Sequence, residues 1–273
     1  MKPSFKKLLF TTAIAATVAP IATAQDNPFI RGRYVDVTTR SQPEFDPEPI
    51  HAGAFDITSS VGVSAAYNDN IFAEPNNEDD DTIFRLTPRV TARSNWSVHE
   101  LSAGLSVYHR EYSANSSESS TDYNLFVNGR IDVSRDFQVR LGADTGHITE
   151  DRWAAASFGA TEPASFDTAS TFVQASYRND RILIEGTVGA SNDEYDQTIQ
   201  QIRDNTSTYA NARLSYAVSP DVAVFVQTRQ TNLDYDQTDR DGTRSTIDAG
   251  VNFELSAPFR GEIAVGNFKD NRD

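Results

Sequence analysis

Alternation of apolar and polar residues is the feature of this sequence that most constrains its fold. In the stretch 82–96, apolar residues such as Leu86 and Val90 hold even-numbered positions, while arginine recurs at odd-numbered ones. Because successive side chains of a strand point to opposite faces, this strand would have one apolar face and one basic face. A soluble sandwich turns its polar face to bulk water, whereas an outer-membrane barrel turns its apolar face to lipid and its polar face to a wet lumen.

The first 24 residues have the features of a secretory signal peptide. Three lysines precede a short apolar run, and the segment ends in Ala22-Thr23-Ala24. We therefore expect an exported protein that is cleaved before Gln25. The apolar run is too short to span a bilayer, and no later window approaches the roughly 20 apolar residues that a membrane helix needs. Insertion into a membrane would therefore have to use strands.

Residues 25–52 contain four prolines and no regular alternation. Proline breaks regular elements, so we expect this segment to form an irregular periplasmic N-terminal extension. Residues 53–273 are then expected to form the barrel.

Segments with period-two alternation recur along the rest of the chain, each about ten residues long or more, which is the length a tilted membrane strand requires. We identify about eleven of them, which predicts an all-β, antiparallel up-and-down transmembrane barrel. Their ranges are 55–67, 82–96, 101–112, 122–133, 137–146, 168–177, 182–195, 207–218, 222–231, 244–255 and 259–268.

The connections between these segments alternate in length. The short ones are 97–100, 134–136, 178–181, 219–221 and 256–258, and the long ones are 68–81, 113–121, 148–167, 196–206 and 232–243. Outer-membrane barrels have short periplasmic turns and longer outer loops, whereas a soluble sandwich has no reason to sort its loops in this way. Hairpins recurring every forty residues would also fit a propeller, but each period holds only two strands and not the four of a propeller blade.

Charge and cysteine content exclude several classes of function. The formal net charge is −15 and cysteine is absent. Nucleic-acid binding requires clustered Lys and Arg, so we expect no nucleic-acid partner. Without cysteine the chain has no lipid-modified Cys, no disulfide and no thiolate metal site, and we expect no cofactor.

No catalytic or metal site is predicted from the sequence. The four histidines are scattered, with no pair at metal-ligand spacing. The acidic run 78–81 lacks the glycine and ligand spacing of an EF-hand and is interpreted as a solvated outer loop. Some outer-membrane barrels are hydrolases, and His109 with Asp122, on neighbouring predicted strands, is a candidate catalytic dyad. Nothing in the sequence distinguishes that pair.

Arginines of the polar parity are the candidate functional residues. Arg85, Arg89 and Arg93 lie on one predicted strand with no acid between them, and we interpret them as a lumen ladder. The other arginines expected to face inward are Arg110, Arg130, Arg140, Arg213, Arg229 and Arg244. They alternate with inward acids, so one interpretation is a charge-compensated wall. The other is a translocation path on which guanidinium groups bind the carboxylates or sulfates of an anionic glycan.

Several short motifs resemble a known family. They are Ser41-Gln42-Pro43-Glu44-Phe45-Asp46-Pro47, Gly53-Ala54-Phe55, Tyr67-Asn68-Asp69-Asn70-Ile71-Phe72, Leu86-Thr87-Pro88 and Ser94-Asn95-Trp96-Ser97-Val98-His99. Their order and spacing are similar to those of the family called Putative beta-barrel porin 2. The resemblance implies an outer-membrane barrel and, less directly, a part in exopolysaccharide export. Pro88 is part of one of these motifs, so the resemblance also accounts for a proline within a strand. We expect a local bulge there, because proline cannot donate a hydrogen bond to the neighbouring strand.

The chain differs from that family in its length. Family members continue for further strands and end on a C-terminal strand, whereas this sequence ends in the polar residues 269–273. Bacterial single-chain barrels use an even number of strands, and about eleven leaves one without a partner. We therefore expect a barrel that is incomplete at its C-terminus.

These observations predict a porin-like channel or export component in the outer membrane of a Gram-negative bacterium. The expected partners are outer-membrane lipid and lipopolysaccharide, an anionic polysaccharide or small solutes, and periplasmic export components. One alternative is a non-conducting barrel that anchors or scaffolds an envelope complex. A barrel hydrolase is a further alternative.

Overall fold

The computed structural model describes residue 29 and residues 47–272, except 75, 77, 155, 156, 158, 159, 238, 239, 257 and 258. The predicted signal peptide and residues 25–28 and 30–46 of the predicted extension lie outside the described residues. The last residues of that extension, Ile50–Ala52, form a short strand, β1.

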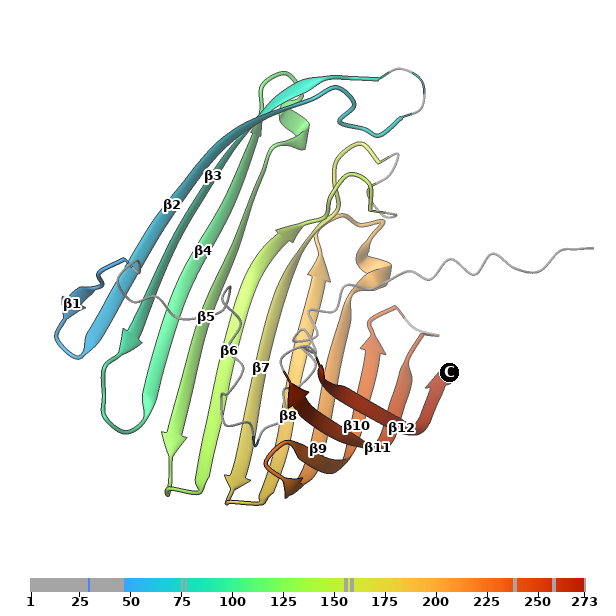
Figure 1. Ribbon diagram of the computed structural model, residues 1–273. Coiled ribbons are helices and arrows are strands. Elements are labelled where there is room, and N and C mark those ends of the chain that lie inside the picture. Colours follow the sequence, from blue (N-terminus) through green and yellow to red (C-terminus); the bar gives the residue numbers. More distant parts are fainter. Residues whose placement is uncertain are drawn as a thin grey trace, which may run out of the picture.

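The described chain forms one twelve-stranded sheet in which each strand pairs antiparallel with the next (Figure 1). After β1 come β2 (Phe55–Asn68), β3 (Asp81–Ser94), β4 (Glu100–Tyr112), β5 (Ser120–Asp132), β6 (Phe137–Thr149), β7 (Ser165–Arg178), β8 (Ile182–Tyr195), β9 (Asn205–Ser219), β10 (Val222–Tyr235), β11 (Gly242–Ser256) and β12 (Phe259–Arg272). The predicted all-β, up-and-down fold is confirmed. The eleven long strands are the eleven predicted segments, and β1 is additional.

Connections at the two ends of the sheet differ in length, as the sequence predicted. At one end, the turn end, they are 53–54, 95–99, 133–136, 179–181, 220–221 and 257–258. At the other, the loop end, they are 69–80, 113–119, 150–164, 196–204 and 236–241. Two short 3₁₀ turns, η2 (Ser116–Glu118) and η3 (Gln201–Arg203), lie in these longer loops. None of the helices in the described part of the chain is long and apolar enough to cross a membrane.

Several strands continue toward the loop end beyond the predicted boundaries. Strand β6 runs on to Thr149, β10 to Tyr235 and β12 to Arg272. The alternation that marked these strands stops earlier, because the outward positions near the loop end are polar, as at His147 and Asn232. Backbone pairing does not depend on that alternation, so the ladder continues where the pattern has ended.

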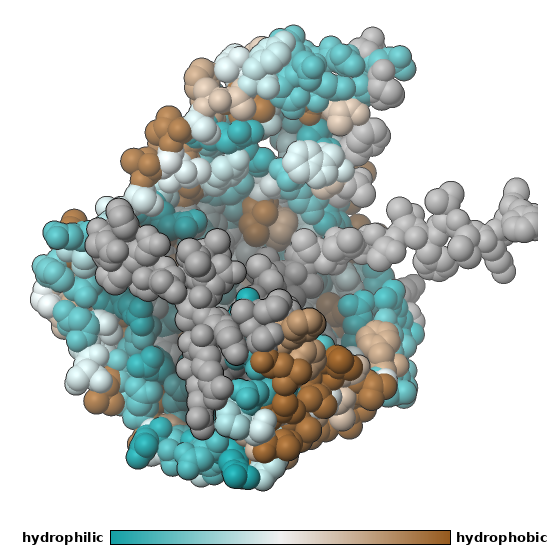
Figure 2. Space-filling view, viewed as in Figure 1, coloured by the Kyte–Doolittle hydropathy of each residue, from teal (hydrophilic) through white to brown (hydrophobic). Residues whose placement is uncertain are grey.

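The strand register places nearly all exposed large apolar side chains of the strands on one face, which we call the apolar face. Val63, Val188 and Val265 are more than half exposed there. Others on this face are Leu86, Val90, Leu105, Leu125, Leu141, Val173, Ile184, Leu214, Val226, Ile247 and Ile263. In Figure 2, brown side chains gather where β10 to β12 lie in Figure 1. Soluble monomers rarely expose so large a patch, whereas lipid covers it without cost.

Four aromatic rings on the opposite, polar face lie over glycines of neighbouring strands. The pairs are Phe126 with Gly104, Phe172 with Gly142, Tyr209 with Gly189 and Phe225 with Gly250. In each pair, a Cβ added to the glycine would lie 2.4–2.6 Å from a ring atom. The missing Cβ therefore makes room for a flat ring against the sheet, an arrangement known to support strand pairing at glycine.

Pro88 interrupts the ladder without shifting it. Pairing between β3 and β4 joins Leu86 to His109 and resumes at Arg89 with Ser106 in the same register. The expected bulge is therefore wrong, because a bulge would add one residue to one strand and change the register. Proline has no N–H to donate, so the ladder opens locally and a small hollow forms beside Arg89.

The sheet curves strongly but does not close (Figure 1). Among the described residues, β12 pairs only with β11, and β1 covers only the first residues of β2. Both outer edges therefore carry backbone groups without a strand partner, which a closed barrel would satisfy.

Gly250 tests the packing of ring over glycine. A Cβ added there would lie 2.4 Å from the backbone oxygen of Ile263 and 2.6 Å from the ring of Phe225. We expect G250A to lower the free energy of unfolding in detergent by about 1–3 kcal/mol, the usual cost of overpacking. The control is G186A, because Gly186 has nothing within 4 Å of an added Cβ. Equal stability of the two variants would contradict this account of the rings.

Candidate functional site: the polar face of the sheet

The polar face carries the nine arginines singled out in the sequence. Arg85, Arg89 and Arg93 lie on β3 opposite Ser64, Ser60 and Asp56 of β2, and opposite residues of paired strands point to the same side. The register also brings Arg110, Arg130, Arg140, Arg213, Arg229 and Arg244 to this side. The polar residues therefore share one face across the whole sheet.

Arg93 belongs to an ion-pair chain near the turn end. Its guanidinium lies 2.8 Å from the Glu100 carboxylate, which Arg130 also contacts at 3.2 Å. Arg130 in turn donates to Asp132 at 3.1 Å. Glu100 would therefore keep one arginine partner if Arg93 were removed.

Arg110 and Arg213 are the most enclosed of these arginines. Arg110 contacts Asp122 at 3.4 Å and Asp151 at 3.2 Å. Arg213 donates to Glu262 at 3.0 Å and lies over the ring of Phe225, 3.7 Å from its centroid. Both are compensated charges of the kind that a wall with a structural role requires.

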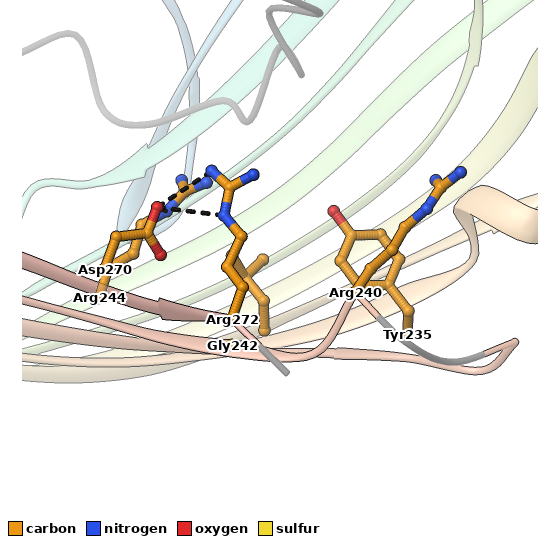
Figure 3. Close-up of a pocket in the computed structure, with 7 residues that line it drawn as sticks. Tyr235, Arg240, Gly242, Arg244, Asp270 and Arg272 are labelled. Atoms are coloured by element: carbon orange, nitrogen blue, oxygen red, sulfur yellow. Dashed lines mark hydrogen bonds and ion pairs between the residues drawn. The ribbon is translucent and has the colours of Figure 1, made fainter.

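A third cluster lies near the loop end of β11 and β12. Arg244 approaches Asp270 at 3.5 Å, and Arg272 donates to the same carboxylate at 3.0 Å. Figure 3 shows these side chains rising from the two strands on the same side as Tyr235 and Arg240. The sequence singled out Arg244 alone, because Asp270 and Arg272 lie beyond the last strand segment that alternation predicted.

Four of the nine arginines form no ion pair with any residue that the structure describes. Arg85 and Arg89 are neighbours on β3, and the Nε atom of Arg85 is buried without a hydrogen-bond partner. Arg140 is exposed, and Arg229 donates only to the amide oxygen of Asn211, at 3.1 Å. The predicted ladder is thus divided: Arg93 is ion-paired with Glu100, whereas Arg85 and Arg89 form no ion pair with the described residues.

Charge is unevenly distributed around the polar face. Strand β3 contributes its three arginines, whereas β8 contributes Glu185 and Asp193 to this face and no basic residue. Glu185 forms no ion pair among the described residues, and Asp193 accepts a hydrogen bond from Thr168 at 2.8 Å. Among these residues, strand β3 therefore carries unpaired positive charge and β8 unpaired negative charge, while Arg140 on β6 and Arg229 on β10 leave further positive charge on either side of β8.

The loops at the loop end are joined by a buried ion pair. Arg152 in loop 150–164 donates through Nε to Glu118 of η2 at 2.9 Å, and both side chains are less than a tenth exposed. Arg152 also donates to the backbone oxygens of Ser157 and Ala160, and it lies over the ring of Phe72. One arginine thus links three of the long loops, a contact between distant segments that the sequence did not predict.

A second pair extends this loop layer. Arg203 of η3 donates to Glu150 and lies over the ring of Tyr195, 4.1 Å from its centroid. Burial alone would lower the pKa of Arg203, but its hydrogen bonds, above all to Glu150, outweigh burial and raise that pKa. This ion pair also ties loop 150–164 to loop 196–204.

The histidines do not form the catalytic dyad considered above. His109 lies on the apolar side of β4 and contacts Thr121, whereas Asp122 lies on the polar face opposite Tyr108. His147, however, contacts Asp167 and lies close to Asp196. Sequence spacing could not show this group, because its three members come from three separate segments.

The sequence model of the family described as Putative beta-barrel porin 2 matches residues 42–273. That range contains all twelve strands of the sheet and every arginine discussed above. No curated protein matches the chain.

Removing one charge from the buried pair of Arg152 and Glu118 should strongly destabilise the loops that this pair joins. In E118Q the Arg152 guanidinium stays buried without its counter-charge, and we expect the free energy of loop opening to fall by about 3–5 kcal/mol. Hydrogen exchange of the amides in 150–154 and 160–164, measured in detergent, reports this opening. D151N removes the half-exposed partner of Arg110 and should cost about 1 kcal/mol or less. Equal exchange in the two variants would show that the loops are held by other contacts.

Proposed function

Because the chain belongs to the Putative beta-barrel porin 2 family, we propose that it forms an outer-membrane channel that passes anionic solutes or an anionic polysaccharide. The family and the antiparallel sheet support an outer-membrane barrel. The substrate and the direction of transport are part of the proposal. The observation that carries it is the pair Arg85 and Arg89, which have no ion pair among the described residues.

The two faces of the sheet support the position in the membrane. The apolar face exposes large aliphatic side chains along all the long strands, and the polar face carries most of the charged residues of the strands. Lipid accepts the first face and rejects the second, because charge at the bilayer midplane costs about 2–4 kcal/mol per residue. We infer that the polar face lines an aqueous lumen.

Arg85 and Arg89 have the properties of a transfer site. Both lie on one face of β3, four residues apart, and Arg89 borders the hollow at Pro88 together with Ser60 and Thr87. A guanidinium binds carboxylate or sulfate through two parallel hydrogen bonds. Conduction requires binding at several sites that is strong enough for entry and weak enough for release. Two neighbouring free arginines meet that requirement better than one buried anion site.

Ion selectivity tests this proposal. In R85Q/R89Q the side chains keep their polarity and lose their charge, so we expect the barrel to assemble and the anion-to-cation permeability ratio in planar bilayers to fall. The matched control is R93Q/R244Q, which also removes two charges. Its acids Glu100 and Asp270 keep Arg130 and Arg272 as partners.

Selectivity that falls equally in both double variants would show that only total charge matters. Unchanged selectivity in R85Q/R89Q would reject the free arginines as a translocation element. A protein that assembles but shows no conductance would instead support the alternative of a non-conducting scaffold. We propose no catalytic role for the polar face.

The orientation in the membrane follows from the loop lengths and can be tested separately. We expect the loop end to face the exterior, because outer loops of such barrels exceed the periplasmic turns in length. Trypsin added to intact cells should cleave after the exposed Arg240 of loop 236–241. Arg135 and Arg181 are also exposed but lie in turns at the opposite end, so they should stay uncut until the cells are lysed. Cleavage of intact cells at Arg135 or Arg181 would mean the reverse orientation.

A further inference from the structure

We propose that His147, Asp167 and Asp196 form a binding site for a divalent transition-metal ion such as zinc, at the loop end of the apolar side. The site is independent of the polar face. It lies in the band where the outward residues become polar, above the lipid-facing aliphatic side chains. One ligand atom from each of the three residues lies within 4.8 Å of the others.

Strand pairing brings the three residues together. His147 of β6 is the direct partner of Asp167 of β7, and Asp196 directly follows β8. The Nδ1 atom of His147 lies 2.9 Å from Asp167 Oδ1, and its Nε2 atom lies 4.0 Å from Asp196 Oδ2. Bonds of zinc to nitrogen and oxygen are each about 2.0–2.2 Å long, so ligand atoms at the tetrahedral angle lie about 3.4 Å apart, and an ion would draw Nε2 and the Asp196 carboxylate slightly closer together.

Neighbouring groups hold these side chains in place. The Ser165 hydroxyl donates to the Asp196 carboxylate. The backbone N–H of Asp196 donates in return to the backbone carbonyl oxygen of Ser165, at 3.1 Å. The ring of Tyr123 stacks on the His147 imidazole, with 6.3 Å between the centroids. Asp167, by accepting from Nδ1, fixes the tautomer that leaves Nε2 free, which is the usual support for a metal-ligating histidine.

Local charge also favours a cation. Asp167 and Asp196 form no ion pair with a lysine or arginine among the described residues, and neither does Glu194, the register partner of Asp167. Two carboxylates thus approach one imidazole, with a third acid on the next strand. Both aspartates are about half exposed, so an ion can enter from solvent and keep water in its remaining positions.

The donor set selects the class of ion. Calcium and magnesium prefer oxygen ligands throughout, whereas imidazole combined with carboxylates suits zinc and its neighbours among the transition metals. Bound there, the ion would join β6, β7 and the loop that follows β8. It would therefore tie loop 196–204 to the ends of the two strands that flank loop 150–164.

Zinc binding by the full chain in detergent tests the proposal. Calorimetric titration with zinc chloride should show one ion per chain, and millimolar calcium or magnesium should not displace it. We expect H147Q and D196N each to weaken binding about tenfold or more, the loss typical of a removed ligand or of its supporting group. His147 is at the surface, so H147Q is expected to keep the strand-dominated circular dichroism spectrum.

The matched control is H51Q. His51 and Asp56 form a histidine-aspartate pair at 2.6 Å without a third acid in the group, so this variant should bind zinc as tightly as the original protein. Absence of zinc binding, displacement by calcium, or undiminished binding in H147Q would each overturn the site. None of these results would bear on selectivity, because the group faces away from Arg85 and Arg89.

Discussion

Backbone hydrogen bonding in the absence of water is the constraint on which this structure depends. Inside a bilayer every unpaired N–H and C=O group costs several kcal/mol, so only helices and paired strands can cross. Inside the sheet this chain meets that requirement by pairing each strand with its immediate neighbours in sequence, whereas among the described residues the outer edges of β2 and β12 keep unpaired groups. Because paired residues share a face, one register fixes the side of every side chain from β2 to β12. The separation of apolar and charged residues is a consequence of that pairing.

The arginines of the polar face fall into two groups, those that form ion pairs and those that form none with the described residues. Arg110 and Arg213 are enclosed by acids, amides and aromatic rings, and they strengthen the wall. Arg85 lies between Ser64 and Arg110, and Arg89 lies between Ser60 and Ser106, so neither has an acid directly opposite. Arginines of the same face are therefore ion-paired at some positions and not at others, and the difference depends on which acids lie within reach of each guanidinium.

Much of the fold could be predicted from sequence, because period-two alternation and loop length are local signals. They were sufficient for all eleven long strands, and the strand register places the nine arginines on one face of the sheet. Strand ends such as Tyr235 and Arg272 were missed, since outward residues near the loop end are polar and the alternation fades before the pairing does. The expected bulge at Pro88 was wrong, because a missing donor opened the ladder without adding a residue.

Contacts between distant segments could not be predicted in this way. The pairs Arg152 with Glu118 and His147 with Asp167 depend on how three loops and two strands meet, and no spacing in one segment encodes that. The rings over Gly104 and Gly250 likewise depend on register. The local signal of these pairs was an aromatic residue at an inward position. That signal predicts a ring packed over the neighbouring strand only when the opposite residue is known to be glycine.

The central claim is that alternate residues of one strand face lipid and water, and cysteine accessibility tests it most directly. The chain has no cysteine, so single cysteines can be placed in turn at positions 84–91 of β3. In proteoliposomes, a charged maleimide should label the odd-numbered positions, while the even-numbered ones should be shielded from it and reached by a lipid-soluble quencher. Uniform labelling along the strand, or labelling with the opposite parity, would contradict the account.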